Sequence, residues 1–314
     1  MVEVSVVIPT FNRMDVLPEV LQALESQLDA PSFEVLVVDD GSNDGTWDWL
    51  TDYRDSTSLR ALTVHRQENA GPATARNWGV QQAVGDRVAF LGDDTVPGEG
   101  WLARHQAAAE SHDEHENVAV IGYTGWHPRM RLNPFLRYIN EYGLQFGYAL
   151  IDDPDDVPFN FLYTSNLSLP RRLLLEEPFD LSFPYAAWED IELSYRLKKR
   201  GLRLVYESRA TVSHDHPTDL RRFMSRQEKA GYSAVVFHQL HPELGGFLGL
   251  GPDGPPPIPS RRRQALKVAL ARALHYLPLS TPRLWESVLR FHYIEGLHRG
   301  WSERVLSPPE KVEG

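Results

Sequence analysis

The sequence predicts an α/β protein with a mixed, mostly parallel sheet, helices on both faces of that sheet, and a helical extension at the C-terminus. Three observations support this prediction. Short β-branched apolar runs alternate with helix-period segments over the first ninety residues. The connections between them are short, and polar residues follow the ends of the apolar runs. Apolar residues make up 42% of the chain and charged residues 24%, as in soluble globular enzymes.

The apolar runs of the first half are nearly continuous, which is typical of strands buried on both faces. The expected strands are residues 4–9, 33–42, 62–67, 87–94 and 117–126. Between them apolar residues recur with a helical period, as at Val16, Val20 and Leu24. The expected helices are residues 14–27, 44–53 and 71–83. This strand–helix alternation predicts βαβ units and therefore parallel pairing.

The second half of the chain is less regular. Residues 161–177 predict a strand, a turn and a short helix, and residues 186–201 predict a longer helix. A Gly/Pro-rich stretch at 245–260 predicts a linker. Residues 261–277 predict a basic amphipathic helix, with more helix after Pro282. The expected division is a catalytic body at 1–215, a helix and linker at 216–260, and a basic helical extension at 261–314.

Composition excludes several kinds of protein. The chain has no cysteine, so disulfides, thiolate zinc sites and cysteine nucleophiles are excluded. Its net charge of −11 argues against a general nucleic-acid binder. Residues 261–314 carry +5, which leaves −16 on the rest of the chain. No run reaches the roughly 18 apolar residues of a membrane span, and Met1–Val4 does not resemble a signal peptide. We expect a cytoplasmic protein.

Asp93 and Asp94 directly follow the apolar run at 87–91. Two adjacent carboxylates repel each other unless a positive charge lies close to them. Mg²⁺ or Mn²⁺ can supply that charge, held by carboxylates and by the phosphates of a substrate. The alternative is a solvated turn with two capping acids. In open α/β sheets ligands bind beyond the carboxyl ends of the strands, where residues 10–13 and 39–42 are also expected.

Five segments in order resemble glycosyltransferase family 2, whose members are inverting enzymes of the GT-A fold. The segments are VSVVIPTFNR, VLVVDDGSNDGT, ENAGPATARNWGV, VAFLGDDTVP and WEDIELSYRLKKRG, and the resemblance covers roughly residues 3–215. It implies metal-dependent single displacement of a sugar from a UDP- or dTDP-sugar to an acceptor hydroxyl, in glycan, polysaccharide or glycoconjugate biosynthesis. Inversion also fits the residues, because we find a base and a leaving-group stabiliser but no additional nucleophile.

The resemblance assigns contacts with the nucleotide sugar to residues that follow the expected strands. They are Pro9, Thr10, Phe11, Arg13, Asp39, Asp40, Gly71, Arg76 and Asp93. Two alternatives remain open for these residues. Asp39 and Asp40 could simply shape a tight turn and cap a helix. Arg76 could pair with Asp39 or Asp93 instead of the diphosphate.

The resemblance also implies a divalent cation, Mn²⁺ or Mg²⁺. Asp94 matches the direct ligand of the family's D-x-D motif, and Asp93 would face the ribose or the metal. Gly92 stands where many members have the first aspartate. His214 matches a further metal ligand, although an isolated histidine is more often structural.

Residues 188–190, Trp-Glu-Asp, match the segment that carries the family's catalytic base. The resemblance implies that Asp190 is the base and that Glu189 positions the acceptor; alternatively, the two acids only complement a helix dipole. Trp188 could stack on a sugar or belong to the core. Ser165 and Asn166 are candidates for binding hydroxyls of the donor or acceptor sugar.

Other functions were considered. A nucleotidyltransferase acting on sugar phosphates would normally carry a Gly-rich N-terminal loop with Arg and Lys, which PTFNRMDVLP lacks. A dinucleotide or methyl-donor binder would carry Gly-x-Gly-x-x-Gly after the first strand. A catalytically inactive, glycosyltransferase-like binding protein is the third alternative, and the presence of Asp94, Glu189 and Asp190 argues against it.

The predicted tail helix places apolar residues on one face and most cations off it. The apolar face comprises Leu266, Leu270, Ala273, Leu274 and Leu277, and the cations are Arg261, Arg262, Lys267 and Arg272. Such a helix could pack on the acidic body, contact a second subunit, or lie on the anionic inner membrane surface. We expect it to take no part in the chemistry.

Overall fold

The computed structural model describes residues 2–59, 61–112, 117–275 and 280–306. Contacts divide the chain into two compact units. The first contains residues 1–131, 140–181 and 189–216, and the second contains residues 132–139, 182–188 and the chain from 217 onward. The first unit ends one residue beyond the predicted body. The predicted linker and tail fall into one unit, together with two short segments from earlier in the chain.

In the part of the chain that the structure describes, eight strands form one sheet in the first unit, in the order β3-β2-β1-β4-β7-β6-β8-β5. The strands are β1 Val4–Thr10, β2 Phe33–Asp39, β3 Leu62–Arg66, β4 Arg87–Leu91, β5 Thr95–Pro97, β6 Val118–Trp126, β7 Asn166–Pro170 and β8 Arg203–His214. β1 to β4 pair in parallel, as do β6 and β8. β7 is antiparallel to β4 and β6, and β5 to β8. The predicted mixed α/β sheet is confirmed.

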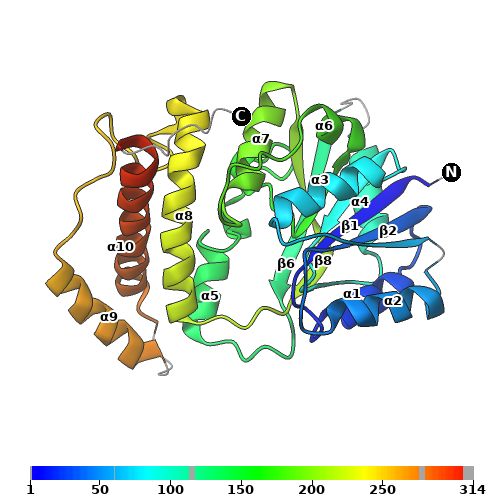
Figure 1. Cartoon of the computed structure of the whole chain (residues 1–314), viewed down its shortest axis with the longest axis horizontal. Helices are drawn as coiled ribbons and strands as arrows, with labels where there is room; N and C mark the ends of the chain where they lie inside the picture. Colours follow the sequence, from blue (N-terminus) through cyan, green and yellow to red (C-terminus); the bar gives the residue numbers. More distant parts are fainter. Residues whose placement is uncertain (1, 60, 113–116, 276–279, 307–314) are drawn as a thin grey trace. The chain divides into compact units, whose positions relative to one another are not determined.

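Helices cover both faces of this sheet. They are α1 Leu17–Glu25, α2 Thr46–Ser56, α3 Pro72–Gln82, α4 Trp101–Glu110, α6 Arg171–Glu176 and α7 Glu189–Lys199, with short 3₁₀ turns η1 Tyr148–Leu150 and η2 Phe159–Phe161. Alternate residues of β1 enter different cores: Val6 and Ile8 pack with α1, whereas Val7 packs with α3. Figure 1 shows α1 and α3 on opposite sides of β1. The near-continuous apolar runs are therefore explained by burial on both faces.

Strand register gathers the polar residues at one edge of the sheet. Thr10 at the end of β1 lies beside Asp39 at the end of β2, and Asp39 lies beside Arg66 at the end of β3. β4 ends at Leu91, earlier than the predicted strand, so Asp93 and Asp94 occupy the turn into β5. β5 then pairs Thr95 with His214 at the end of β8.

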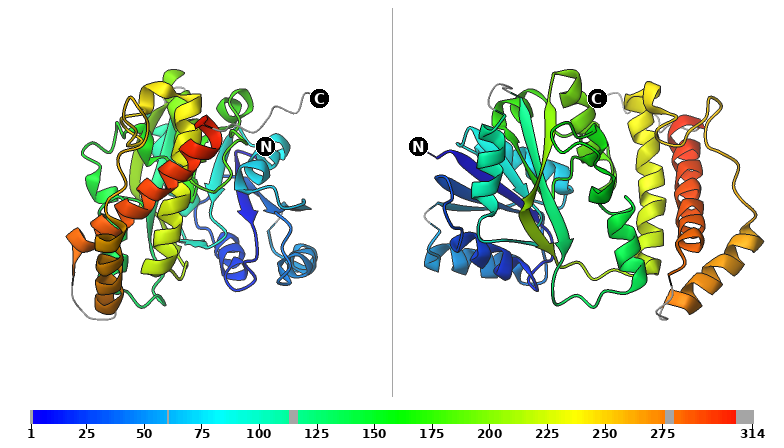
Figure 2. Two further views of the ribbon diagram at one scale, coloured as in Figure 1. Left: turned by 60° about the vertical axis from the view of Figure 1, so that its left-hand side comes forward. Right: turned by 180° about the vertical axis from the view of Figure 1, so that it is seen from behind.

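The second unit is helical. Its elements are α8 Leu220–Leu240, α9 Arg261–His275, α10 Pro282–Trp301, most of α5 Pro134–Glu141, and the short turns η3 Pro242–Leu244 and η4 Ser302–Leu306. α8 and α10 lie side by side, as both views of Figure 2 show. Gly231 and Gly296 allow this approach, because an added Cβ would lie 2.0 Å from the carbonyl oxygen of Tyr293 or Glu228, respectively. Of the predicted tail helix, Leu277 lies outside the described residues. None of the helices that the structure describes is long and apolar enough to span a bilayer.

Candidate active site

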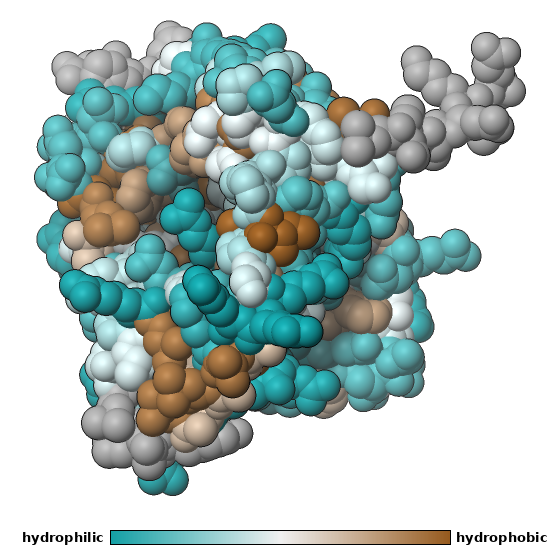
Figure 3. Space-filling view, turned by 90° about the vertical axis from the view of Figure 1, so that its left-hand side faces the viewer, coloured by the Kyte–Doolittle hydropathy of each residue, from teal (hydrophilic) through white to brown (hydrophobic). Residues whose placement is uncertain are grey.

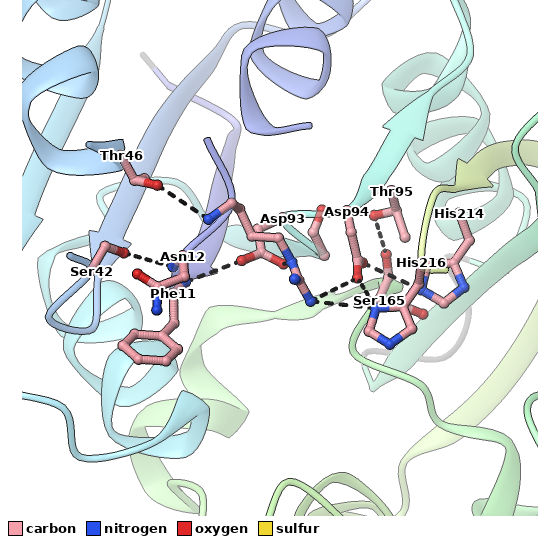
Figure 4. Close-up of polar contacts among 12 residues, drawn as sticks. Phe11, Asn12, Ser42, Thr46, Asp93, Asp94, Thr95, Ser165, His214 and His216 are labelled. Atoms are coloured by element: carbon pink, nitrogen blue, oxygen red, sulfur yellow. Dashed lines mark hydrogen bonds and ion pairs between the residues drawn. The ribbon is translucent and has the colours of Figure 1, made fainter. Parts of the chain in front are cut away.

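Arg13 supplies positive charge to the two adjacent aspartates. Its Nε lies 3.4 Å from Asp93 Oδ1, and its Nη2 lies 3.3 Å from Asp94 Oδ2. The backbone N–H of Phe11 donates to Asp93 at 3.2 Å (Figure 4). The repulsion expected from the sequence is thus partly relieved by the loop after β1. Arg13, predicted to line the nucleoside pocket, lies on the acidic pair.

The two aspartates differ in their ionisation. Burial and the neighbouring carboxylate of Asp94 raise the pKa of Asp93 to about 6. Burial alone would raise the pKa of Asp94 as well, but the imidazoles of His214 and His216 hold it well below its usual value. Asp94 therefore stays ionised to a lower pH than Asp93 does.

Asp94, His214 and His216 converge in a group that could hold a metal ion. Among the described residues, one ligand atom from each lies within 4.8 Å of the others. Asp94 lies 3.4 Å from Nε2 of His214 and 3.0 Å from Nδ1 of His216 (Figure 4). The carboxylate is a donor that suits Mn²⁺, and the two imidazoles favour a transition-metal ion over Mg²⁺. Nδ1 of His214 is buried without a hydrogen-bond partner, so this ring has an unused donor or acceptor.

Two further details bear on this group. A Cβ at Gly92 would lie 3.3 Å from a carboxylate oxygen of Asp94, so the glycine at the variant position of the D-x-D motif leaves room beside the carboxylate. Asp93 is held by Phe11 and Arg13 and lies outside the group. His216 was not predicted. Its spacing of two from His214 along an extended segment was the available signal, because such residues share a face.

The loops after β1 and β2 are joined by side-chain hydrogen bonds. The backbone N–H groups of Asn12 and Arg13 donate to the hydroxyls of Ser42 and Thr46 at 2.8 and 3.1 Å (Figure 4). Asn12 has a φ of 53° and accepts from the backbone of Asn43 at 2.8 Å. The residues that form these hydrogen bonds were not predicted, although they lie inside the segments that resemble the family.

Asp39 and Asp40 are both buried. Asp39 accepts from the backbone of Ser42 at 3.1 Å and lies 3.3 Å from Nε of Arg66. Asp40 accepts from the side chain of Gln67 and from the backbone N–H groups of Ala70 and Gly71, at 2.7 to 2.9 Å. These contacts favour the loop-shaping alternative for both aspartates.

The remaining predicted donor-binding residues lie at the end of β1, just after it, and between β3 and α3. Phe11 is 44% exposed, whereas Thr10 is buried and its side chain acts on Asp93, lowering the pKa of that carboxyl. Pro9 is partly buried in β1. Gly71 has a φ of 87°, a conformation that favours glycine, and no atom would contact an added Cβ. The space beside Gly71 is therefore open.

Arg76 pairs with neither of the acids expected from the sequence. Its Nη1 donates to Glu189 at 3.0 Å, and its guanidinium lies 5.4 Å from the ring centroid of Phe179. The neighbouring Asp190 has no such partner. Burial and the Glu189 carboxylate raise the pKa of Asp190 to about 7, which is a suitable value for a general base at neutral pH.

The three residues predicted to bind sugars lie in different environments. Ser165 lies beside the group formed by Asp94, His214 and His216. Its carbonyl accepts from Gly92 and Thr95, and its hydroxyl is buried without a partner. The amide of Asn166 accepts from the side chains of Trp101 and His105 and donates to the backbone of β6 and β8. Its hydrogen-bonding capacity is therefore used inside the sheet, which argues against a sugar contact.

Trp188 belongs to the second unit. Its indole N–H donates to the carbonyl of Ala230 at 2.9 Å, and its ring contacts Phe237 and Phe247. Its φ of 75° is unusual for a residue other than glycine. These contacts favour the structural role for Trp188.

A mixed sheet with carboxylates and imidazoles at its strand ends, and a partly buried aspartate of raised pKa at a helix start, define a transferase of the GT-A class. The chain belongs to glycosyl transferase family 2, whose sequence profile matches residues 5–168. This family membership argues against the nucleotidyltransferase alternative.

Relatives and solved structures agree with this assignment. The chain is 30% identical over 249 residues to the pre-mycofactocin glycosyltransferase of Mycobacterium tuberculosis, covering 77% of this chain and 48% of that protein. It is 31% identical to the validoxylamine A glucosyltransferase of Streptomyces hygroscopicus, covering 76% and 57%. The chain thus spans about half the length of these relatives.

The fold is shared with more distant structures. The mannosyltransferase PcManGT of Pyrobaculum calidifontis, solved with GDP-Man and Mn²⁺, has a TM-score of 0.61 at 18% identity, covering 96% of this chain and 88% of that one. TarS 1–349 of S. aureus has a TM-score of 0.51 at 19% identity, covering 95% and 89%. At this identity the likeness concerns the fold alone.

Proposed function

We propose that this glycosyltransferase moves a sugar from a nucleotide-diphosphate sugar to an acceptor hydroxyl in a single, inverting displacement. The observation that carries the proposal is the separation of roles at the start of α7. Glu189 is ion-paired with Arg76, whereas Asp190 keeps an unpaired carboxylate of raised pKa. A carboxylate in that state can accept the proton of a hydroxyl group near neutral pH.

In the proposed step the acceptor oxygen forms a bond to the anomeric carbon while the bond from that carbon to the diphosphate oxygen breaks. The bonding electrons leave with the nucleoside diphosphate, and the acceptor proton passes to Asp190. No covalent sugar–enzyme bond is needed. The sugar therefore leaves with inverted configuration, which NMR of the product can determine.

The group formed by Asp94, His214 and His216 is proposed to hold Mn²⁺ or Mg²⁺. Its carboxylate fits either ion, whereas its two imidazoles favour Mn²⁺ over Mg²⁺. When bound, the ion neutralises negative charge on the diphosphate leaving group. Arg13 is positively charged, like the proposed ion, and lies against Asp93 and Asp94. We assign it to orienting these two carboxylates.

The donor and acceptor are proposed as classes. Sequence resemblance favours UDP- or dTDP-sugars, and a structural neighbour solved with GDP-Man makes GDP-sugars a necessary part of any screen. The relatives' names include validoxylamine A and pre-mycofactocin. The acceptor screen should therefore contain compounds of these two kinds in addition to glycans.

The test measures release of nucleoside diphosphate from a panel of nucleotide sugars, with and without Mn²⁺, first by hydrolysis and then with acceptors. We expect one donor to be turned over by the wild type and not by Asp190→Asn. Turnover that is the same in both proteins would contradict the assignment of Asp190. No turnover of any sugar donor would contradict the proposed donor class.

A further inference from the structure

Helix α9 exposes two of its three leucines and buries a small and a polar residue, while Val268 and Leu274 are partly buried. Leu266 and Leu270 are 73% and 52% exposed. The buried positions are Gln264 and Ala271. A surface helix that packs on its own protein normally turns its apolar stripe inward, so α9 has the opposite orientation.

The inward face of α9 is thinly packed. A cavity of about 430 Å³ lies against α10, and Val268, Phe291 and His292 are among the residues that line it. Polar contacts supplement this packing: Arg261 lies 3.5 Å from Glu295, and Lys267 donates to Ser287 at 2.7 Å. Burial of apolar surface therefore contributes little to holding this helix.

The outward face combines leucines with cations. α9 has five Arg and Lys residues and no acid. At 100° per residue, Arg262 and Arg263 lie on either side of the line through Leu266 and Leu270, and both arginines are exposed. Figure 3 views the side on which α9 lies and shows exposed hydrophobic side chains among hydrophilic ones.

We propose that the outward face of α9 binds an anionic lipid surface, with Leu266 and Leu270 entering the interface and Arg262 and Arg263 contacting lipid phosphates. Helices that combine an apolar stripe with flanking cations bind such surfaces, because burial and charge attraction add together. The rest of the chain carries −16 and is repelled by anionic lipid, so this cationic face determines the orientation of binding.

A lipid surface fits this face better than a second copy of the chain does. Stable protein interfaces bury roughly 1,200–2,000 Å² in total. Two leucines with neighbouring alanines on one helix offer far less apolar surface than that. A bilayer needs no complementary protein surface, and it accommodates a narrow stripe bordered by arginines.

Co-sedimentation of the full chain with vesicles tests the proposal without any sugar donor, so its outcome is independent of the proposed reaction. We expect binding to phosphatidylcholine vesicles that contain phosphatidylglycerol, weaker binding at high salt, and no binding to phosphatidylcholine alone. Leu266→Ser with Leu270→Ser, and separately Arg262→Gln with Arg263→Gln, should each lower the partition coefficient at least about tenfold.

Matched controls come from the first unit. Leu175→Ser with Leu181→Ser removes two exposed leucines, and Arg54→Gln with Lys198→Gln removes two exposed cations. Both controls should bind vesicles as the wild type does. The proposal is overturned if the wild type stays in the supernatant or if the α9 variants bind as the controls do. A wild-type dimer in light scattering that the leucine variant dissociates, without vesicle binding, would identify a second copy as the partner instead.

Discussion

Arg76 and Glu189 form a buried ion pair across 113 residues of sequence, with Nη1 3.0 Å from Oε1 and side chains only 12% and 6% exposed. The pair makes two adjacent acids chemically different. Glu189 has its own cation, whereas Asp190 is partly buried beside a negative charge and has a raised pKa. The proposed reaction uses this difference, with Glu189 positioning groups and Asp190 accepting a proton.

Asp190→Asn is expected to lower the rate of transfer by about 10² to 10⁴, because the amide keeps the shape of the side chain but cannot accept the proton. Binding of the nucleoside diphosphate should change little. Steady-state kinetics and calorimetry measure the two quantities. Asp156→Asn, at an exposed position, is the control. Wild-type turnover of Asp190→Asn at saturating acceptor would mean that another group is the base.

Glu189→Gln is expected to shift the pH dependence of kcat toward lower pH. The Glu189 carboxylate contributes to raising the pKa of Asp190 to about 7, whereas Arg76 lowers it. Burial still raises the pKa in the variant, but the carboxylate no longer adds to that effect while Arg76 still opposes it, so the pKa of Asp190 falls. Because the active form of the base is ionised, kcat rises with pH through this pKa. The acidic limb of the kcat–pH profile should therefore move to lower pH.

The measurement for Glu189→Gln is a kcat–pH profile of both proteins at saturating donor and acceptor. A simple loss of acceptor positioning would lower the plateau without moving the limb. A limb that stays in place, or that moves to higher pH, would contradict the electrostatic coupling of the two acids.

His216→Ala and Asp94→Ala are each expected to weaken binding of Mn²⁺ together with UDP or dTDP. Loss of a residue that only orients metal ligands typically costs 10- to 100-fold in metal affinity, so loss of a direct ligand should cost at least about that much. Isothermal titration of the nucleotide with and without Mn²⁺ gives the value, and His112→Ala is the control. Nucleotide binding and turnover that EDTA does not affect would contradict a role for the metal.

Local sequence pattern predicted the sheet, its two covered faces and the polar residues at its strand ends, because strand ends follow from apolar runs and short connections. His214 came from the family resemblance and not from local pattern. Local pattern did not predict the partner of Arg76, since a contact across 113 residues has no local signal. His216 had a local signal in its spacing from His214. For Asn166, polarity alone could not reveal that two side chains of α4 and two strand carbonyls use its amide.

The association of α8 with α10 was also not predicted. Glycine in a helical segment indicates low helix propensity, and the sequence does not show that it allows two helices to approach closely. Deleting the chain after Ser260 would remove α10 from α8 and would therefore test folding together with tail function. Single substitutions at the contact give a cleaner measurement of how closely the two helices pack.

Gly296→Ala is expected to destabilise the protein, although alanine favours a helix interior by about 1 kcal/mol over glycine. The added Cβ would lie 2.0 Å from the carbonyl oxygen of Glu228 in α8. A backbone atom cannot rotate away, so the helices must separate, and overpacking of this kind typically costs about 1–3 kcal/mol. Gly246→Ala is the control, because no atom lies within 4 Å of its added Cβ. Urea unfolding should give a lower midpoint for Gly296→Ala than for Gly246→Ala. A higher midpoint would show that propensity outweighs contact and that α8 and α10 pack less closely than their glycines indicate.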